Sequence, residues 1–235
     1  MRRAALCVLP LLMAVTAGAA YAQNGYETAI LGQTIFISPS GQPFRAKVGE
    51  AFPEAQWFAQ ADTDKDGKIS SDEFSADAAA FFNRLDVNHD GYISSMENTA
   101  YETNIAPEIT RTDPRIAQPV DHYQAPDQDM DADPNGDKTR YIKQIIGASQ
   151  YGLIDEPQPI RAADQNFDFR ISGDEWAAAT VQRFSILDRN GDGFITPDEL
   201  PKTPLQLYLE APKDPKKDKG KSHRHGSWGW GASGQ

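Results

Sequence analysis

The chain has 235 residues, with 34 Asp or Glu against 23 Lys or Arg, so its formal net charge is −11. This acidic balance argues against nucleic-acid binding, because phosphate backbones select basic proteins. The length is sufficient for one domain or for two small ones.

The amino terminus has the pattern of a secretory signal peptide over residues 1–22. Arg2 and Arg3 precede an apolar run, and Ala20–Ala22 fits a signal-peptidase site. A membrane anchor is the alternative, but the apolar run is short. We therefore expect cleavage after Ala22 and a periplasmic or secreted bacterial protein. The single cysteine, Cys7, lies in this segment, so the mature chain has no thiol for a disulfide.

Residues 23–50 form an extended segment before the first motif. The sequence TIFISPSGQPFRA predicts a short strand that ends in a Pro-Ser-Gly turn. Pro53 is then placed to begin a helix, because proline is tolerated in the first helical turn.

Four segments repeat the ligand spacing of a calcium loop. They begin at Asp62, Asp86, Asp164 and Asp188, with starts 24 residues apart within each half and 102 residues apart between halves. Such a loop needs oxygen ligands at positions 1, 3, 5, 7, 9 and 12 and Gly at position 6. Because Ca²⁺ prefers carboxylate and carbonyl oxygen, the repeat predicts Ca²⁺ as the cofactor.

Loops 1 (residues 62–73), 2 (86–97) and 4 (188–199) match this pattern at every position. At position 7 the ligand is the backbone carbonyl, so the side chain there is free to vary. The predicted ligands of loop 1 are Asp62, Asp64, Asp66, Lys68, Ser70 and Glu73. Those of loop 2 are Asp86, Asn88, Asp90, Tyr92, Ser94 and Glu97. Those of loop 4 are Asp188, Asn190, Asp192, Phe194, Thr196 and Glu199.

Loop 3 (residues 164–175) departs from the pattern at position 6, where Phe169 replaces Gly. If the backbone keeps a positive φ there, a bulky residue costs about 1–2 kcal/mol. The loop then binds weakly, binds with altered geometry, or remains only as a structural partner of another loop. Its predicted ligands are Asp164, Asn166, Asp168, Arg170 and Glu175, with Ser172 at position 9.

A fifth acidic stretch begins at Asp131 but lacks the closing Glu at position 12. We interpret it as a solvated acidic loop, because the bidentate ligand is missing.

Apolar residues recur at helical spacing between the loops of each half. A helix from about Ser71 to Asp86 would span roughly 24 Å and would place loops 1 and 2 at its opposite ends. No proline interrupts it, so we expect a continuous helix and pairing between loops of different halves. The predicted core positions are Phe74, Ala78, Phe81, Phe82, Leu85, Trp176, Thr180, Phe184 and Leu187. The residues expected in short strands between paired loops are Ile69, Ile93, Ile171 and Ile195.

Residues 105–160 connect the halves, and we expect a short helix at Tyr141–Ala148. The basic stretch at 211–235 contains Trp228 and Trp230 among Gly and Ser near its end, which is typical of a disordered tail. Two interpretations remain open for this tail. It improves solubility, or it attaches the protein to an anionic envelope surface.

The loops resemble those of calmodulin-type EF hands, and the chain resembles secreted bacterial EF-hand proteins. The resemblance implies a mainly α fold with two EF-hand pairs, at 51–104 and 161–210, joined by short β-bridges between loops and flanked by the signal peptide and the disordered tail. The 24-residue spacing is similar to that of the lanmodulin family, in which non-adjacent loops pack together. Two features of that family are absent: position 2 is never Pro, and position 9 is Ser or Thr instead of Asp.

The function favoured by the sequence is that of a calcium buffer, sensor or calcium-stabilised scaffold. The alternatives are an envelope-interaction protein that uses its tail, and a lanthanide binder. A Met-rich sensor groove is not favoured, because Met96 and Met130 are the methionines outside the leader. We expect no enzyme, since His89 lies inside loop 2, His122 stands alone, and no catalytic motif is present. No particular protein partner is predicted.

Overall fold

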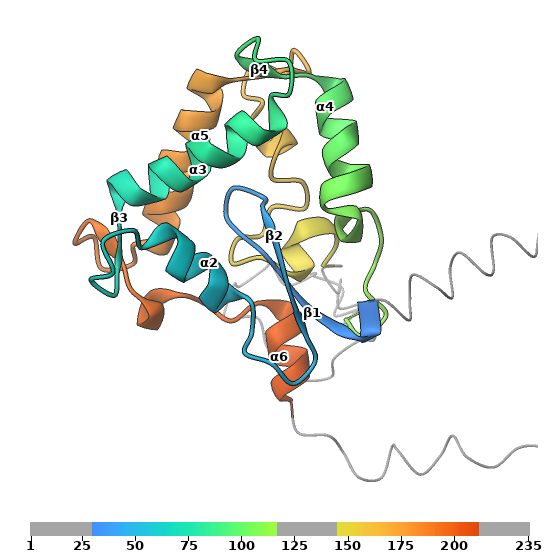
Figure 1. The fold of residues 1–235 in the computed structure, drawn as a ribbon, viewed down its shortest axis with the longest axis vertical. Coiled ribbons are helices and arrows are strands. Elements are labelled where there is room, and N and C mark those ends of the chain that lie inside the picture. The colour runs from blue at the N-terminus through green and yellow to red at the C-terminus, as the bar shows by residue number, and fades with distance from the viewer. Residues whose placement is uncertain (1–29, 117–144, 212–235) are drawn as a thin grey trace, which may run out of the picture.

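The computed structural model describes residues 30–116 and 145–211 (Figure 1). The predicted signal peptide, the acidic stretch that begins at Asp131 and the tail beyond Ala211 lie outside the described residues. Among the residues that are described, no helix has both the length and the apolar character needed to cross a bilayer.

A hairpin lies at the centre of the molecule (Figure 1). Strands β1 (Gln33–Ile37) and β2 (Pro43–Lys47) pair antiparallel, with Phe36 opposite Phe44. Because strand side chains alternate, Ile35 and Ile37 pack into one hydrophobic cluster and Phe36 into another. The predicted strand and turn are confirmed, and the residues after the turn form the second strand.

Five α-helices surround this hairpin in the described ranges, and four of them, α2 to α5, begin or end at a loop motif. They are α2 (Glu54–Ala61), α3 (Ser71–Leu85), α4 (Ser95–Ala100), α5 (Gly173–Leu187) and α6 (Pro204–Glu210). Shorter turns are the π-helix Tyr101–Ile105 and the 3-10 helices Pro107–Thr110, Gly147–Gln150, Arg161–Ala163 and Pro197–Glu199.

The longest helices, α3 and α5, each run without interruption from one loop to the next. They lie side by side (Figure 1), with Phe74 against Phe184 (ring centroids 5.5 Å apart) and Phe82 against Trp176 (5.7 Å). The early residue of α3 meets the late residue of α5, so the two helices are antiparallel. The predicted continuous helix after loop 1 is confirmed, and every predicted core position on it is buried.

Short bridges join loops from different halves of the chain. Strand β3 (Ile69–Ser70) pairs with β6 (Phe194–Ile195), and β4 (Tyr92–Ile93) pairs with β5 (Ile171–Ser172). Loop 1 therefore pairs with loop 4, and loop 2 with loop 3, which confirms the pairing expected from helix length. The loop pairs consequently do not coincide with the segments 51–104 and 161–210, because each segment contributes one loop to each pair.

Two hydrophobic clusters lie at the two ends of the α3–α5 layer. The Trp57 cluster contains Phe36, Trp57, Ala61, Ile69, Phe74, Phe184, Leu187 and Ile195. The Trp176 cluster includes Ile35, Ile37, Phe81, Phe82, Leu85, Ile93, Ile171 and Trp176. Each cluster contains the two Ile residues of one bridge, so each loop pair is anchored directly in the core.

The prediction of a helix at Tyr141–Ala148 was wrong for the part of this range that the structure describes, residues 145–148. Ile146 is extended, and a 3-10 turn begins at Gly147 with φ +62°. A Cβ at Gly147 would lie 2.1 Å from the carbonyl oxygen of Pro157. The close contact with Pro157, which also accepts a hydrogen bond from the N–H of Ala148 (2.8 Å), replaces helical geometry here.

Candidate metal centre

The residue at position 1 holds the backbone of each loop through its carboxylate. In loop 1 the N–H of Asp66 donates to Asp62 Oδ1 (3.1 Å) and the N–H of Gly67 donates to Asp62 Oδ2 (3.0 Å). The position-6 contact recurs from Gly91 to Asp86 (2.9 Å), from Phe169 to Asp164 (3.0 Å) and from Gly193 to Asp188 (2.9 Å). All four loops therefore share the same tight turn around their first ligand.

Positions 3, 5 and 7 also follow one scheme in every loop. In loop 1 the N–H of Asp66 donates to Asp64 Oδ1 (3.2 Å), and the N–H of Lys68 donates to Asp66 Oδ1 (3.0 Å). The matching acceptors at position 3 are Asn88, Asn166 and Asn190, and those at position 5 are Asp90, Asp168 and Asp192. The N–H donors at position 7 are Tyr92, Arg170 and Phe194. The structure thus brings the predicted ligands of these positions into one turn in each loop.

The glutamate at position 12 closes each loop and caps the helical turn that follows. Glu73 Oε1 accepts from the N–H of Thr63 (2.8 Å), while Oε2 accepts from the N–H (2.9 Å) and the hydroxyl (2.8 Å) of Ser70. The same Oε2 contacts join Glu97 to Ser94, Glu175 to Ser172 and Glu199 to Thr196. Position 12 is therefore held near positions 2 and 9 of its own loop.

These hydrogen bonds keep the closing glutamates ionised. The backbone and hydroxyl donors of Ser70 lower the pKa of Glu73 to about 2. Donation from Ser172 and from Thr196 lowers the pKa of Glu175 and of Glu199. At Glu97 desolvation opposes the shift, but the donors of Ser94, Val87 and Asn88 together lower the pKa. A carboxylate at position 12 is the charged form that a cation needs.

The role of position 9 as a helix cap was missed in the sequence. The hydroxyl oxygen of Ser70 accepts from the N–H of Glu73 (3.3 Å), so the two residues form a reciprocal capping box. The signal was present, because Ser or Thr followed three residues later by Glu is a capping-box pattern. The same residues therefore serve both helix initiation and the candidate metal site.

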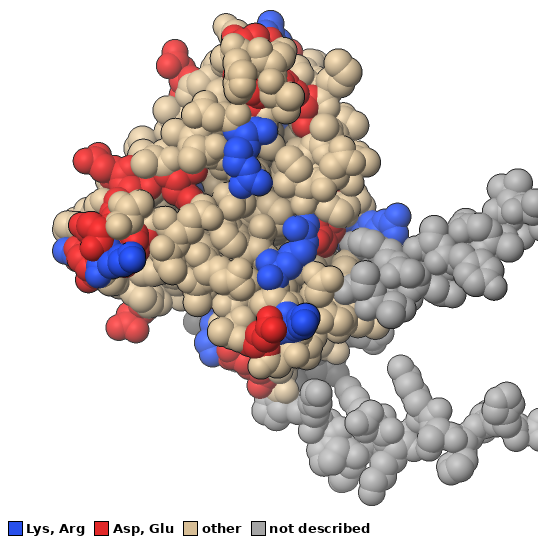
Figure 2. All heavy atoms as spheres, in the orientation of Figure 1, with Lys and Arg blue, Asp and Glu red and all other residues tan. Residues whose placement is uncertain are grey.

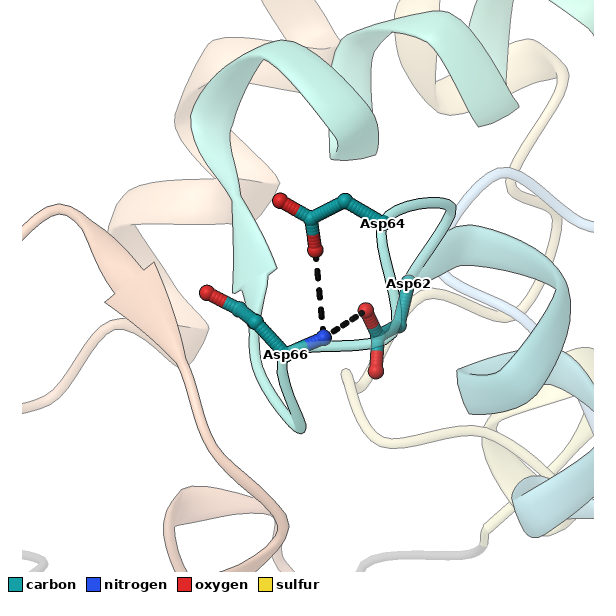
Figure 3. Close-up of side chains that lie close together, drawn as sticks. All are labelled: Asp62, Asp64 and Asp66. Atoms are coloured by element: carbon teal, nitrogen blue, oxygen red, sulfur yellow. Dashed lines mark hydrogen bonds between the residues drawn. The ribbon is translucent and has the colours of Figure 1, made fainter.

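Loop 1 gathers three carboxylates at one point. Asp62, Asp64 and Asp66 each offer an oxygen, and these oxygens lie within 4.8 Å of one another (Figure 3). Ligands on opposite sides of a Ca²⁺ ion are separated by about 5 Å, so the group fits such an ion. In loops 2, 3 and 4 an Asn stands at position 3, and its amide nitrogen donates to the Asp at position 5 at 3.1 or 3.2 Å.

Loop 3 has a carboxylate oxygen without a partner. Asp164 Oδ1 is buried and forms no hydrogen bond with the described residues. In loops 1, 2 and 4 the equivalent oxygen accepts from the N–H at position 5, and in loop 4 Asp188 Oδ1 also accepts from Gly191 (2.8 Å). Because a buried unpaired oxygen is unfavourable, this atom is suited to a cation ligand.

Phe169 keeps the backbone geometry of the glycine that it replaces. Its φ is +66°, whereas Gly67, Gly91 and Gly193 lie between +83° and +88°. Its N–H also makes the position-6 hydrogen bond. The departure at position 6 therefore adds strain without changing the turn.

A cation–aromatic contact joins the two loops of each pair at position 7. The ammonium of Lys68 in loop 1 lies 3.4 Å from the ring centre of Phe194 in loop 4. The guanidinium of Arg170 in loop 3 lies 4.1 Å from the ring of Tyr92 in loop 2 and 3.8 Å from Asp90. The position-7 side chains thus stabilise the pairs, while the Ile residues at position 8 face the core.

Asp and Glu side chains gather at two corners of the molecule, one beside β3 and one beside β4 (Figure 2). These are the corners occupied by the loop pairs. Carboxylates so close together repel one another, and a bound divalent cation removes that repulsion. The arrangement therefore suits cation binding at both corners.

A model of the EF hand family matches the chain at residues 54–76, 78–97 and 180–202. These stretches contain loops 1, 2 and 4, whereas loop 3 lies outside them. Comparisons with curated proteins and with solved structures found no match. The three matches support an EF-hand calcium-binding protein, and EF hands bind Ca²⁺ through loops of this kind.

Proposed function

We propose that the protein is an exported Ca²⁺-binding protein in which the ions stabilise a scaffold. The observation that carries this proposal is the common hydrogen-bond arrangement of four loops that are paired across the two halves of the chain. The proposed ligands are the side-chain oxygens at positions 1, 3, 5 and 12, the carbonyl at position 7, and position 9 directly or through water.

The scaffold role is supported by the position of the bridges in the core. Ile69, Ile93 and Ile195 are fully buried and Ile171 is 3% exposed. A loop that is loose without metal would therefore disturb its hydrophobic cluster as well. Binding stabilises the fold by mass action, by about 2.7 kcal/mol per site at 100 times the dissociation constant.

The four sites are expected to differ in affinity. Loop 1 offers Asp at positions 1, 3 and 5, whereas the others offer Asn at position 3, and affinity rises with ligand charge. Loop 3 is expected to be the weakest, because Phe169 stays in a left-handed conformation. Its unpaired Asp164 oxygen nevertheless favours occupancy.

Calorimetric titration of the chelator-stripped protein with Ca²⁺, Mg²⁺ and La³⁺ tests the proposal. We expect three or four Ca²⁺ per chain and a rise in melting temperature as they bind. If millimolar Ca²⁺ produces neither heat of binding nor a higher melting temperature, the proposal fails. A preference for La³⁺ far beyond that of calcium-loop proteins would favour the lanthanide alternative.

Glu73→Gln tests the assignment of a single loop. Removing the charge of the bidentate ligand should abolish about one Ca²⁺ site, because position 12 closes the coordination sphere. Glu50→Gln is a matched control, since Glu50 is an exposed glutamate outside the loops that accepts from the N–H of Lys47. Equal stoichiometry in both variants would contradict the assignment of loop 1.

Export is supported by the leader pattern at residues 1–22. The expected outcome is a mature protein that begins at Gln23 in the periplasm or medium. Mass spectrometry of the protein from fractionated cells measures this directly, and an uncleaved cytoplasmic form would contradict it.

A second candidate is an envelope-interaction protein in which Ca²⁺ only holds the fold together. Residues 213–235 carry six Lys or Arg against two Asp, and they contain Trp228 and Trp230. Deletion of this tail should then release the protein from envelope fractions. Unchanged retention would eliminate this candidate and leave the scaffold role.

A further inference from the structure

Two large aromatic side chains protrude from loop 3. Phe167 is 81% exposed and Phe169 is 74% exposed, and both have a positive φ, at +60° and +66°. Exposure of a phenylalanine and a left-handed backbone are each unfavourable. Position 4 has a positive φ in every loop, so what sets loop 3 apart is the exposure of both rings and a non-glycine residue at position 6. Two such exposed rings on one loop, separated by one residue, point to a role for the side chains themselves.

Metal geometry does not account for these phenylalanines. The equivalents of Phe167 at position 4 are Lys65, His89 and Gly191, and those of Phe169 at position 6 are all glycine. The other loops keep the same hydrogen bonds without an aromatic residue at either position. The rings of Phe167 and Phe169 are therefore not needed to hold the metal ligands in place.

Hydrogen bonds hold loop 3 against loop 2, so the backbone that carries Phe167 and Phe169 is fixed in place. Ser95 Oγ donates to the carbonyl of Phe169 (3.0 Å), and the N–H of Gly173 donates to the carbonyl of Gly91 (3.3 Å). Met96, next to Ser95, is 82% exposed. The loop pair thus carries exposed apolar side chains at a corner of the molecule that is otherwise acidic (Figure 2).

We propose that the tip of loop 3 inserts Phe167 and Phe169 into a lipid surface when loops 2 and 3 hold divalent cations. This inference rests on the proposed function, because insertion depends on the bound cations. It goes beyond that function by assigning an attachment site to the folded part of the chain.

The small area of the tip favours lipid over a protein partner. A phenylalanine contributes about 150–250 Å² when it is buried, so two rings offer roughly 300–500 Å². A stable protein interface needs about 800 Å² from each partner. Aromatic side chains on a convex tip can instead enter the interface of a bilayer, which deforms around them.

The negative charge of loops 2 and 3 makes insertion of the rings depend on bound cations. Loops 2 and 3 carry seven carboxylates and one guanidinium, that of Arg170. Without cations this charge keeps water around the tip and repels an anionic surface. Two divalent ions would supply four positive charges and so offset most of the charge of the seven carboxylates.

Vesicle co-sedimentation of the full chain tests the inference. The probe is vesicles of phosphatidylcholine and phosphatidylglycerol in equal parts, with excess Ca²⁺ or with chelator. We expect binding with Ca²⁺ and release by chelator. The variant Phe167→Gly with Phe169→Gly gives loop 3 the residues of loop 4 at these positions, and its partition should fall by about tenfold.

The glycine variant separates insertion from metal binding. Removing the strain at position 169 should preserve or improve Ca²⁺ affinity in calorimetry, so weaker lipid binding could not be attributed to a lost ion. The matched control is Val181→Ser with Ile186→Ser, which removes exposed apolar side chains from α5 (62% and 54% exposed) and should leave partition unchanged.

Several results would overturn the inference while leaving the proposed function intact. They are no sedimentation of Ca²⁺-loaded protein, equal sedimentation of the glycine variant, or binding that persists in chelator, as the basic tail alone would give. A Ca²⁺-dependent dimer without vesicle binding, seen by analytical ultracentrifugation, would assign the rings to a second copy instead. Failure of Ca²⁺ binding itself would overturn both proposals.

Discussion

The two ends of α3 carry loop pairs that share the same hydrogen-bond pattern but differ in the residue at position 6. At the Ser71 end, loops 1 and 4 have Gly at position 6 in both loops and contact the Trp57 cluster. At the Leu85 end, loops 2 and 3 have one Gly and Phe169, and contact the Trp176 cluster. Both bridges nevertheless have the same Ile–Ile register.

This comparison shows that turn geometry and pairing are specified by different residues. The turn depends on position 1 and on the N–H groups that it accepts from, including that of Phe169. Pairing depends on the buried Ile at position 8 and on the cation–aromatic contact at position 7. A change at position 6 therefore alters strain and surface chemistry without changing which loops pair.

The largest expected effect comes from the bridge residues. Ile69→Ala and Ile93→Ala each remove a fully buried side chain, so each should lower the free energy of unfolding by about 2–5 kcal/mol. Chemical denaturation in excess Ca²⁺ measures both. Similar losses would confirm that the two pairs contribute equally to the core, and a loss below about 1 kcal/mol in one variant would show that its pair is dispensable.

The next contrast concerns two buried tryptophans that donate to neighbouring residues of α3. Trp57 Nε1 donates to the carboxylate of Asp77 (3.1 Å), whereas Trp176 Nε1 donates to the carbonyl of Ala78 (2.9 Å). Asp77→Ala leaves the Trp57 indole without this acceptor and should cost about 1–3 kcal/mol of unfolding free energy. Asp77→Asn keeps an acceptor and should cost less.

The same pair predicts different responses to pH. Burial raises the pKa of Asp77 above its ordinary value of 3.8, so the ionised carboxylate lowers stability at neutral pH. As the pH falls through the raised pKa, protonation removes this loss. The indole N–H resonance of Trp57 should shift over that range in NMR spectra, while that of Trp176 should not. Asp77→Asn should abolish the Trp57 shift, and its persistence would contradict the assignment.

A smaller effect is expected from exchanging the residues at position 6. Phe169→Gly relieves about 1–2 kcal/mol of strain but loses about 0.5–1 kcal/mol to the entropy of glycine, which leaves a modest gain. Gly193→Phe in loop 4 should have the opposite effect. Unfolding and Ca²⁺ titration of both variants compare the loops directly. A loss of stability in Phe169→Gly would mean that the ring makes favourable contacts in solution.

The smallest effect should come from the position-7 contacts. Lys68→Met and Arg170→Met each remove a cation from an aromatic ring, and each should cost about 0.5–1 kcal/mol at these partly exposed sites. Lys65→Met is the control, because Lys65 is exposed in the same loop and has no aromatic contact among those found in the described residues. If Lys65→Met lowers the free energy of unfolding by as much, loss of the aromatic contact does not explain the effect of the other two variants.

Residues whose partners are close in sequence, or whose spacing repeats, could be predicted. The loop ligands, the core stripe of α3 and the four bridging Ile residues all follow from local spacing. Pairing across the halves followed from the length of one helix that no proline interrupts. These features require no knowledge of the distant chain.

The buried arginine ion pairs outside the loops could not be predicted, because their partners are distant in sequence or are defined only in the fold. Arg183 is 2% exposed, and its guanidinium donates to Glu156 (2.7 Å) and to the carbonyl of Pro159 (2.6 Å). Asp113 and Arg115 form an ion pair at 2.6 Å that also reaches the carbonyl of Gln33. Nothing in the local sequence distinguishes these charges from solvated ones.

The two long helices and the two β-bridges connect the four loops in a cycle. Helix α3 leads from loop 1 to loop 2, the β4–β5 bridge to loop 3, α5 to loop 4, and the β3–β6 bridge back to loop 1. The four loops therefore form a closed ring, in which every member has two neighbours and none is terminal. A ring has no fraying end, so even an empty loop 3 would remain tethered on both sides by members that hold their ions.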